Sequence, residues 1–186
     1  MTAAHRADEP PIDAARFEGF VREFQDMVFA VAVRLLGNVA EAEDVAQTVF
    51  LRAFEHFKEV GASPAAGGWL KAVATNLCLN HLSRYRARWQ SLGEHEGEGG
   101  IEAAARATGA SPLEAAERTD RAERVERALQ ALPDHQRVPL VLFHFEEMSY
   151  AEIAVKLGVS VAKVKTDIYR ARERLRSQLS DLYESR

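Results

Sequence analysis

Fourteen residues near the C-terminus, KVKTDIYRARERLR, combine six basic side chains with only two acidic ones. Apolar residues recur here every three or four positions, so a helix has one apolar face and, opposite it, an exposed crest flanked by basic side chains. The apolar positions are Val161, Val164, Ile168, Ala171 and Leu175. Such a helix fits the major groove of DNA, where side chains reach base edges and arginines contact phosphates. The structural alternative is a solvated helix of a bundle.

The residues before this helix favour the DNA-binding interpretation. Ser149 followed by Glu152 three positions later forms a capping box, which starts a short helix. Gly158 permits a tight turn, and Ser160 can cap the next helix. A cap, a short helix, a turn glycine and a second helix in this order predict a helix-turn-helix.

A second basic segment, LSRYRARW, alternates three arginines with Tyr85 and Trp89. Arginines bind phosphates and aromatic rings stack on unpaired bases, so this surface suits partly opened DNA. The structural alternative is equally simple. A basic helix end complements its own dipole, and Trp69 and Trp89 can be core residues.

The net charge of −4 is unevenly distributed along the chain. Acidic residues gather in EAEDVAQ and in GEHEGEGGIE, apart from the two basic segments. In EAEDVAQ they begin a helix, where carboxylates often complement the dipole; the alternative is a docking face for a basic protein surface. This segregation predicts two basic surfaces and a separate acidic one.

Composition points to an all-α protein of 186 residues, with 47% hydrophobic and 8% aromatic residues. No stretch of about 18 apolar residues and no apolar leader is present, so we expect a cytoplasmic protein without membrane insertion. Cys78 is the only cysteine, and the six histidines lack zinc-site spacing. No nucleophile–base pair or nucleotide loop is found, so we expect no metal, no cofactor and no enzymatic activity.

Helical periodicity and breakers divide the chain into two small helical domains joined by a flexible linker. Three helices, at about 17–36, 40–57 and 69–89, form the first, and the second contains the helix-turn-helix. A further helix is expected from about Asp134, although Pro139 inside it removes one backbone hydrogen bond. The predicted division is a tail at 1–15, a domain at 16–90, an acidic linker at 91–111 and a domain at 112–186.

These segments, in this order, resemble the extracytoplasmic-function (ECF) sigma factors, small bacterial proteins that direct RNA polymerase to promoters. LLGNVAEAEDVAQTVFLRAF is similar to the family's core-binding segment, and GGWLKAVATNLCLNHLSRYRAR to its promoter-melting segment. ALPDHQRVPLVLFHFEEMSYAEIAVKLGVSVAKVKTDIYRARERL resembles the second DNA-binding domain. The resemblance covers all but the N-terminal tail and the linker.

The resemblance implies that core RNA polymerase and promoter DNA are partners, and that an anti-sigma factor regulates the chain. It assigns core-polymerase binding to Glu43, Asp44, Gln47 and Phe50. The loop before the third helix and that helix would open the minus-10 element, with Asn76, Asn80, Arg84, Arg86 and Arg88 near the DNA. The minus-35 element would be bound by Lys163, Lys165, Thr166, Asp167, Tyr169, Arg170 and Arg172.

Some positions depart from the family pattern. Asn80 and Ser83 lower the positive charge of the melting segment, and Lys163 replaces a common threonine. Asp167 stands where arginine is usual, and we expect it either to accept a hydrogen bond from a cytosine or to pair with Arg170 or Arg174. Two other functions remain open at this point. These are a stand-alone helix-turn-helix transcriptional regulator, and an anti-sigma or adaptor protein that uses the same helices for protein contacts.

Overall fold

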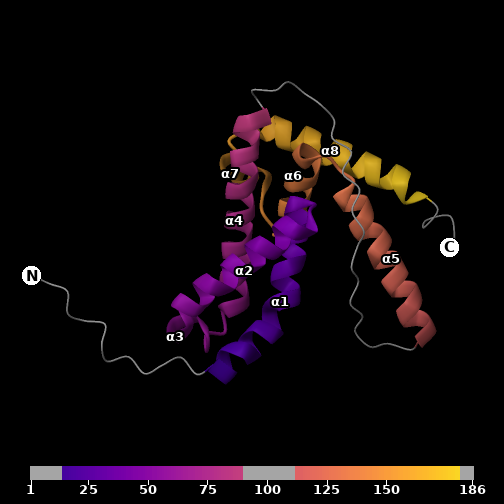
Figure 1. The fold of residues 1–186 in the computed structure, drawn as a ribbon. Helices are drawn as coiled ribbons and strands as arrows, with labels where there is room; N and C mark the ends of the chain where they lie inside the picture. The colour runs from indigo at the N-terminus through magenta and orange to yellow at the C-terminus, as the bar shows by residue number, and fades with distance from the viewer. Residues whose placement is uncertain (1–13, 90–111, 181–186) are drawn as a thin grey trace, which may run out of the picture.

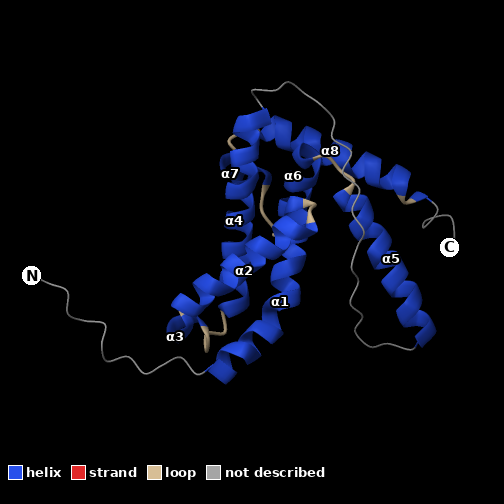
Figure 2. Ribbon diagram, viewed as in Figure 1, coloured by secondary structure: helices blue, strands red, loops and turns tan. Residues whose placement is uncertain are grey.

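The computed structural model describes residues 14–89 and 112–180, and within these ranges the chain forms helices and turns without a strand (Figure 1 and Figure 2). Side chains at 84–89 and 112–119 are outside the description. The helices are α1 (Ala14–Leu36), α2 (Val39–Glu55), α3 (Phe57–Val60), α4 (Ala66–Trp89), α5 (Pro112–Gln130), α6 (Asp134–His144), α7 (Tyr150–Leu157) and α8 (Val161–Gln178). The predicted all-α fold class is confirmed.

The helices α1, α2 and α4 pack together as a bundle, with the short α3 at one end (Figure 1). Completely buried side chains at its centre are Val28, Leu35, Val49, Ala53 and Leu70. The Oδ1 atom of Asn38 accepts a hydrogen bond from the backbone N–H of Glu41 at 3.2 Å, which satisfies one donor at the start of α2. The single helix predicted for 40–57 is interrupted at His56, between α2 and α3.

The helices α7 and α8 form the predicted helix-turn-helix. Ser149 Oγ accepts from the backbone N–H of Glu152 at 3.3 Å, and Glu152 Oε2 accepts from the backbone N–H of Ser149 at 2.8 Å. Gly158 adopts φ 65°, a left-handed conformation that favours glycine, and so turns the chain between the helices. Ser160 Oγ then caps α8 through the backbone N–H of Lys163 at 3.2 Å.

The helix α6 continues through Pro139 from Asp134 to His144. Proline has no N–H, so the carbonyl four residues earlier, that of His135, lacks its usual helical partner. The ring of Pro139 is completely buried, and its removal from water offsets part of the free energy that is lost with the hydrogen bond. The conflict between the helical pattern and the proline is thus settled in favour of the helix.

The two groups of helices share one hydrophobic core. The helix α1 packs against α6 and, more loosely, against α5, while α6 in turn packs on α8. Buried residues from both groups, such as Leu35 and Leu36 of α1 and Leu132 and Val141 beyond the linker, belong to one cluster. The helix-turn-helix is therefore held against the first bundle, a contact that periodicity alone does not predict.

The capping box gives a test of how α7 is stabilised. Ser149→Ala should lower the free energy of unfolding by about 1 kcal/mol at neutral pH, because the backbone N–H of Glu152 loses its acceptor. Hydrogen bonds from Ser149 hold the pKa of the Glu152 carboxyl below its ordinary value. The stabilisation that these hydrogen bonds give is therefore complete when the pH is above the ordinary pKa of a glutamate. It is lost as the pH falls through the lowered pKa of Glu152.

Urea unfolding of the wild-type and Ser149→Ala proteins, over the pH range in which Glu152 becomes protonated, measures the difference in their free energies of unfolding. A deficit in the Ser149→Ala protein that stays constant as Glu152 becomes protonated would contradict the reciprocal capping.

Candidate nucleic-acid interface

The helix α8 presents a polar crest opposite its apolar face. Val164, Ile168 and Ala171 are buried, as the helical wheel predicts, whereas Val161 at the first turn is 40% exposed. The predicted contact residues that are exposed on α8 are Lys163, Lys165, Thr166, Tyr169, Arg170 and Arg172. The apolar face packs against the rest of the domain, so these six side chains can face DNA when the helix lies in a groove.

Arg172, at a flank of the crest, is already oriented by neighbours in the same domain. Arg172 Nη2 lies 3.0 Å from His144 Nε2, and its guanidinium lies over the Phe143 ring, 5.5 Å from the centroid. Burial, and then the charge of Arg172, lower the pKa of His144, so the neutral ring can accept a hydrogen bond from that arginine. Arg172 is thus held in place before any phosphate binds.

The expectation for Asp167 is wrong. Asp167 is only 5% exposed, and its Oδ2 lies 2.9 Å from Nζ of Lys163, one turn earlier, rather than pairing with Arg170 or Arg174. Its charge also acts on His135 of α6, whose pKa is lowered by burial and partly raised again by this carboxylate. A buried carboxylate facing α6 cannot accept a hydrogen bond from a cytosine, so Asp167 orients Lys163 and supports the helix packing.

The helix α4 exposes Asn76 and Asn80 one turn apart. Ser83 Oγ donates to the carbonyl of Asn80 at 2.8 Å, so the hydroxyl is bonded within its own helix. Arg84, Arg86 and Arg88 fall within the last turns of α4, but their side chains lie outside the described residues. The two asparagines therefore mark where a polar surface on α4 begins.

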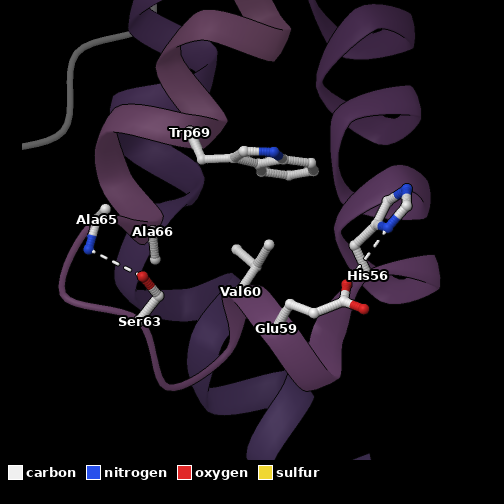
Figure 3. Close-up of a pocket in the computed structure, with 7 residues that line it drawn as sticks. All are labelled: His56, Glu59, Val60, Ser63, Ala65, Ala66 and Trp69. Carbon is white, nitrogen blue, oxygen red and sulfur yellow. Dashed lines mark hydrogen bonds and ion pairs between the residues drawn. The ribbon is translucent and has the colours of Figure 1, made fainter.

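An open pocket of about 290 Å³ lies where α3 and the following loop meet the start of α4 (Figure 3). The Trp69 ring lies across it, with Val60 on the opposite side and small residues at one edge. The lining residues are His56, Glu59, Val60, Ser63, Ala65, Ala66 and Trp69. An aromatic face above a pocket with polar groups at its rim is suited to a flat, polar ring.

Two contacts shape the rim of this pocket. His56 Nδ1 lies 3.5 Å from Glu59 Oε2, and Ser63 Oγ accepts from the backbone N–H of Ala65 at 3.2 Å (Figure 3). The ring of His56 meets that of Trp69 edge-on, with centroids 6.1 Å apart. Trp69 is only partly buried. The core role that the sequence analysis considered for Trp69 therefore applies to only one part of its ring.

The helix α2 carries an exposed stripe that changes from acidic to apolar along its length. Glu43, Asp44 and Gln47 are exposed, as the docking interpretation requires. Phe50 is partly buried and packs on the core, whereas Leu51 is 67% and Phe54 44% exposed. The large apolar side chains available to a partner are therefore Leu51 and Phe54.

Sequence reasoning missed Leu51, Phe54 and the pocket residues His56, Glu59 and Ser63. Spacing could have found the first two, because positions 44, 47, 51 and 54 repeat every three or four residues along one helical face. The pocket depends on how α3 and its loop fold back on α4, which spacing does not encode. In the described part of the chain, no helix is long and apolar enough to cross a membrane.

Two family models match the chain, in the order of the two groups of helices. Sigma-70 region 2 matches residues 20–88, and Sigma-70, region 4 matches residues 122–175. The first match contains the α2 stripe, the pocket and the exposed asparagines of α4. The second contains the helix-turn-helix and the crest of α8.

Curated relatives match over nearly the whole chain. ECF RNA polymerase sigma factor SigW of Bacillus subtilis is 33% identical over 172 residues, 91% of this chain and 92% of that protein. RNA polymerase sigma-E factor of Streptomyces coelicolor is 30% identical over 90% of this chain and 88% of its own length. Among solved structures, the sigma factor RpoE of Bartonella quintana, in complex with the anti-sigma factor NepR, shares the fold with a TM-score of 0.52, at 21% identity over 88% of this chain and 96% of that one.

The position of Asp167 predicts a stability effect. Asp167→Ala should lower the free energy of unfolding by about 1 to 2 kcal/mol, because a buried charge-assisted contact is lost. Glu173 on the same helix is a matched control, since it pairs with Arg176 at 2.5 Å where both side chains are exposed. Glu173→Ala should cost at most about 0.5 kcal/mol.

Urea unfolding of both variants measures the two effects. An Asp167→Ala protein that keeps its stability but changes its DNA sequence preference would show that the carboxylate faces DNA.

Proposed function

The chain belongs to the extracytoplasmic-function family of RNA polymerase sigma factors, and we propose that three surfaces of the chain divide the work of such a factor. As a sigma factor it binds core RNA polymerase and directs promoter recognition and transcription initiation. The α2 stripe binds the polymerase, the Trp69 pocket with α4 binds the minus-10 element, and the α8 crest binds the minus-35 element. The observation that carries this proposal is that all three surfaces are exposed on one chain.

The α2 stripe has the composition of a protein-docking face. Leu51 and Phe54 offer exposed apolar area that gains free energy when a partner removes it from water. Glu43, Asp44 and Gln47 lie next to them and favour a basic partner surface through charge complementarity. Phe50 supports the stripe from beneath through its packing on the core. An apolar centre beside charged residues is typical of a specific protein interface.

The pocket beside Trp69 supports capture of an unpaired base during promoter opening. Unstacking a base costs a few kcal/mol, and stacking on an aromatic side chain returns about 1 to 3 kcal/mol. His56 and Ser63 at the rim supply polar groups that can contact a base edge. Asn76 and Asn80 continue the surface along α4, and Arg84, Arg86 and Arg88 are assigned to the same strand on the family resemblance alone.

The crest of α8 supports recognition of duplex DNA. Lys165, Thr166, Tyr169 and Arg170 occupy its first turns, where a recognition helix meets base edges. The hydroxyl of Thr166 donates to the carbonyl of Ala162 at 3.0 Å, so its lone pairs and methyl group face outward. Lys163 and Arg172 at the flanks are placed for phosphate contacts, each steadied by a neighbour in the same domain.

The domain division and the partners follow from these assignments. Residues 16–90 form the polymerase and minus-10 domain, residues 112–186 the minus-35 domain, and 91–111 the linker between them. The polymerase supplies the catalytic groups, so this chain acts without catalysis of its own. It works in the cytoplasm, where the polymerase and the promoter are found. An anti-sigma factor binds it and keeps it inactive, as the complex of the related Bartonella quintana protein suggests.

Run-off transcription tests the proposed function, and the affinity for core polymerase tests the docking face. DNA bound by this protein with purified core polymerase is selected and sequenced, and the recovered promoter is then transcribed. Glu43→Lys should weaken core binding by about fivefold or more, because it puts like charge against a basic partner. Glu23→Lys reverses the charge of another exposed acidic residue, on α1, and should leave core binding unchanged.

Three outcomes would contradict the proposal. A protein that gives no transcript from any selected DNA is not a working sigma factor, and specific DNA binding without polymerase would instead indicate a stand-alone regulator. Equal core affinities for the two charge reversals would remove the docking role of α2.

Trp69 gives a separate test of base capture. Trp69→Ala should reduce open-complex formation on duplex promoter by about 10-fold or more, because the stacking surface is lost. Trp69→Phe should retain much of the activity, since it keeps an aromatic face. On a promoter with a mismatched, already open minus-10 region, part of the opening cost is removed and Trp69→Ala should recover. Permanganate reactivity of unpaired thymines measures the opening; an equal defect on both templates would mean that Trp69 only supports the fold.

A further inference from the structure

Two aromatic rings from different helices stack on each other beside α8. Phe143 lies near the end of α6 and Tyr150 begins α7. Their ring centroids are 4.7 Å apart, and the angle between the ring planes is 17°. Both rings are half-buried and pack on the hydrophobic core. The stacked pair is thus fixed on one side by the core and keeps part of its surface for other side chains.

A basic side chain of α8 lies over each ring. The ammonium nitrogen of Lys165 lies 5.9 Å from the centroid of Tyr150, and the guanidinium carbon of Arg172 lies 5.5 Å from the centroid of Phe143. Both distances are within the range at which the negative face of an aromatic ring attracts a cation. The stacked rings therefore form one support for two basic side chains of α8.

Lys165 and Arg172 lie on the same face of α8, two turns apart. Seven residues of helix rise by about 10.5 Å and bring the side chain back to within about 20° of its first direction. Side chains on one face of a recognition helix meet the same part of the groove. In the proposed function Lys165 meets base edges and Arg172 contacts a phosphate, so this face carries one group of each kind.

A second contact fixes the guanidinium of Arg172. Its Nη2 lies 3.0 Å from Nε2 of His144, and the His144 ring meets the Phe143 ring edge-on, with centroids 5.0 Å apart. Two consecutive residues of α6 therefore hold one guanidinium, one through a ring face and the other through a ring nitrogen. A side chain that is ordered in advance loses less conformational freedom when it binds a phosphate.

The contact with Tyr150 leaves the hydrogen-bond donors of Lys165 available. An ammonium group has three N–H groups, and an aromatic face attracts its charge rather than binding one N–H as a carboxylate does. Lys163, by contrast, lies 2.9 Å from the carboxylate of Asp167. Lys165 is therefore the better placed of the two lysines to donate to the N7 and O6 atoms of a guanine in the major groove.

The turn between α6 and α7 brings the two rings together. Glu147 adopts φ 54°, a left-handed conformation that is uncommon for residues other than glycine. The backbone N–H of Met148 donates to the carbonyl of Leu142 at 3.1 Å and so closes the turn. Strained backbone is concentrated at functional sites, where surrounding contacts hold it. This strained turn places Tyr150 beside Phe143, seven residues earlier in the chain.

We propose that Phe143 and Tyr150 are positioning residues for minus-35 recognition, and that the stacked pair fixes the distance between the charged groups of Lys165, which donates to a guanine, and Arg172, which binds a phosphate. The inference rests on the proposed function, because the rings act only through these two DNA contacts. Phosphate contacts set the register of a protein on DNA, and base contacts carry the sequence information. A fixed distance between the two groups therefore makes the base contact depend on the register that the phosphate sets.

Replacement of Tyr150 tests the support of Lys165 in the full-length chain with core polymerase. Lys165→Ala first identifies the base pair that this lysine reads, which should contain guanine. Tyr150→Leu should then reduce the ratio of affinities for the selected promoter and for one changed at that base pair, by about two- to tenfold. Tyr150→Phe keeps an aromatic face and should keep the ratio. A loss of folded protein alone would not change this ratio.

Replacement of Phe143 tests the support of Arg172. Phe143→Leu should weaken promoter binding by about two- to tenfold and make the dependence of affinity on salt less steep, as expected when a phosphate contact is weakened. In an Arg172→Ala background, Phe143→Leu should not weaken the salt dependence further. Leu179→Ala is the matched control, because this buried residue lies two turns beyond Arg172. It should lower stability but leave the affinity ratio and the salt dependence unchanged.

Nuclear magnetic resonance of the free chain tests the two contacts without DNA. The methylene protons next to the Lys165 ammonium and the Arg172 guanidinium should be shifted upfield, because each group lies over an aromatic ring. The shift of Lys165 should disappear in the Tyr150→Leu protein, and that of Arg172 in the Phe143→Leu protein.

The outcomes separate this inference from the proposed function. An unchanged affinity ratio in Tyr150→Leu overturns the positioning of Lys165, and additive effects of Phe143→Leu and Arg172→Ala on the salt dependence overturn that of Arg172. An equal loss of the ratio in Leu179→Ala would indicate a general packing defect and overturn both. If the wild-type holoenzyme discriminates at no minus-35 base pair, the proposed minus-35 role fails and the positioning role fails with it, while the upfield shifts still decide whether the rings hold both cations.

Discussion

A single guanidinium group reaches the ends of three helices and thereby sets how the two domains lie against each other. Arg137 binds carbonyls at the end of α1, the carbonyls of Gln130 and Leu132 at the end of α5, and the carboxylate of Asp134 at the start of α6. Each of these termini carries groups that its own helix cannot satisfy. The orientation of the helix-turn-helix relative to the first bundle depends on this shared donor.

The same residue explains how a charged group can lie in a largely apolar core. Five N–H groups in a rigid fork can serve several carbonyls at once, which an ammonium group on a flexible stem does less well. Around Arg137 the cluster of Leu35, Leu132 and Val138 excludes water and strengthens these bonds. The apolar and polar parts of the interface therefore depend on each other.

Much of the fold follows from local sequence signals, and the failures have identifiable causes. The caps at Ser149 and Ser160 and the turn at Gly158 are determined by neighbouring residues, and all three were predicted. Asp167 was misplaced because a helical wheel divides residues by angle and does not show which face α6 covers. Leu51 and Phe54 were not named for a similar reason, since the width of the buried face of α2 depends on α1 and α4. The contact between the domains joins residues about 100 positions apart, beyond the reach of any periodicity.

The division of α8 into a buried face and an exposed crest has a consequence for how such proteins diversify. The residues that hold the helix in place, Val164, Asp167, Ile168 and Ala171, are buried. Lys165, Thr166, Tyr169 and Arg170 make up the crest, and substitutions there cost little folding free energy. After gene duplication, a copy can therefore acquire a new promoter preference through crest substitutions while its fold is retained, and a regulon can separate from its parent without an unstable intermediate.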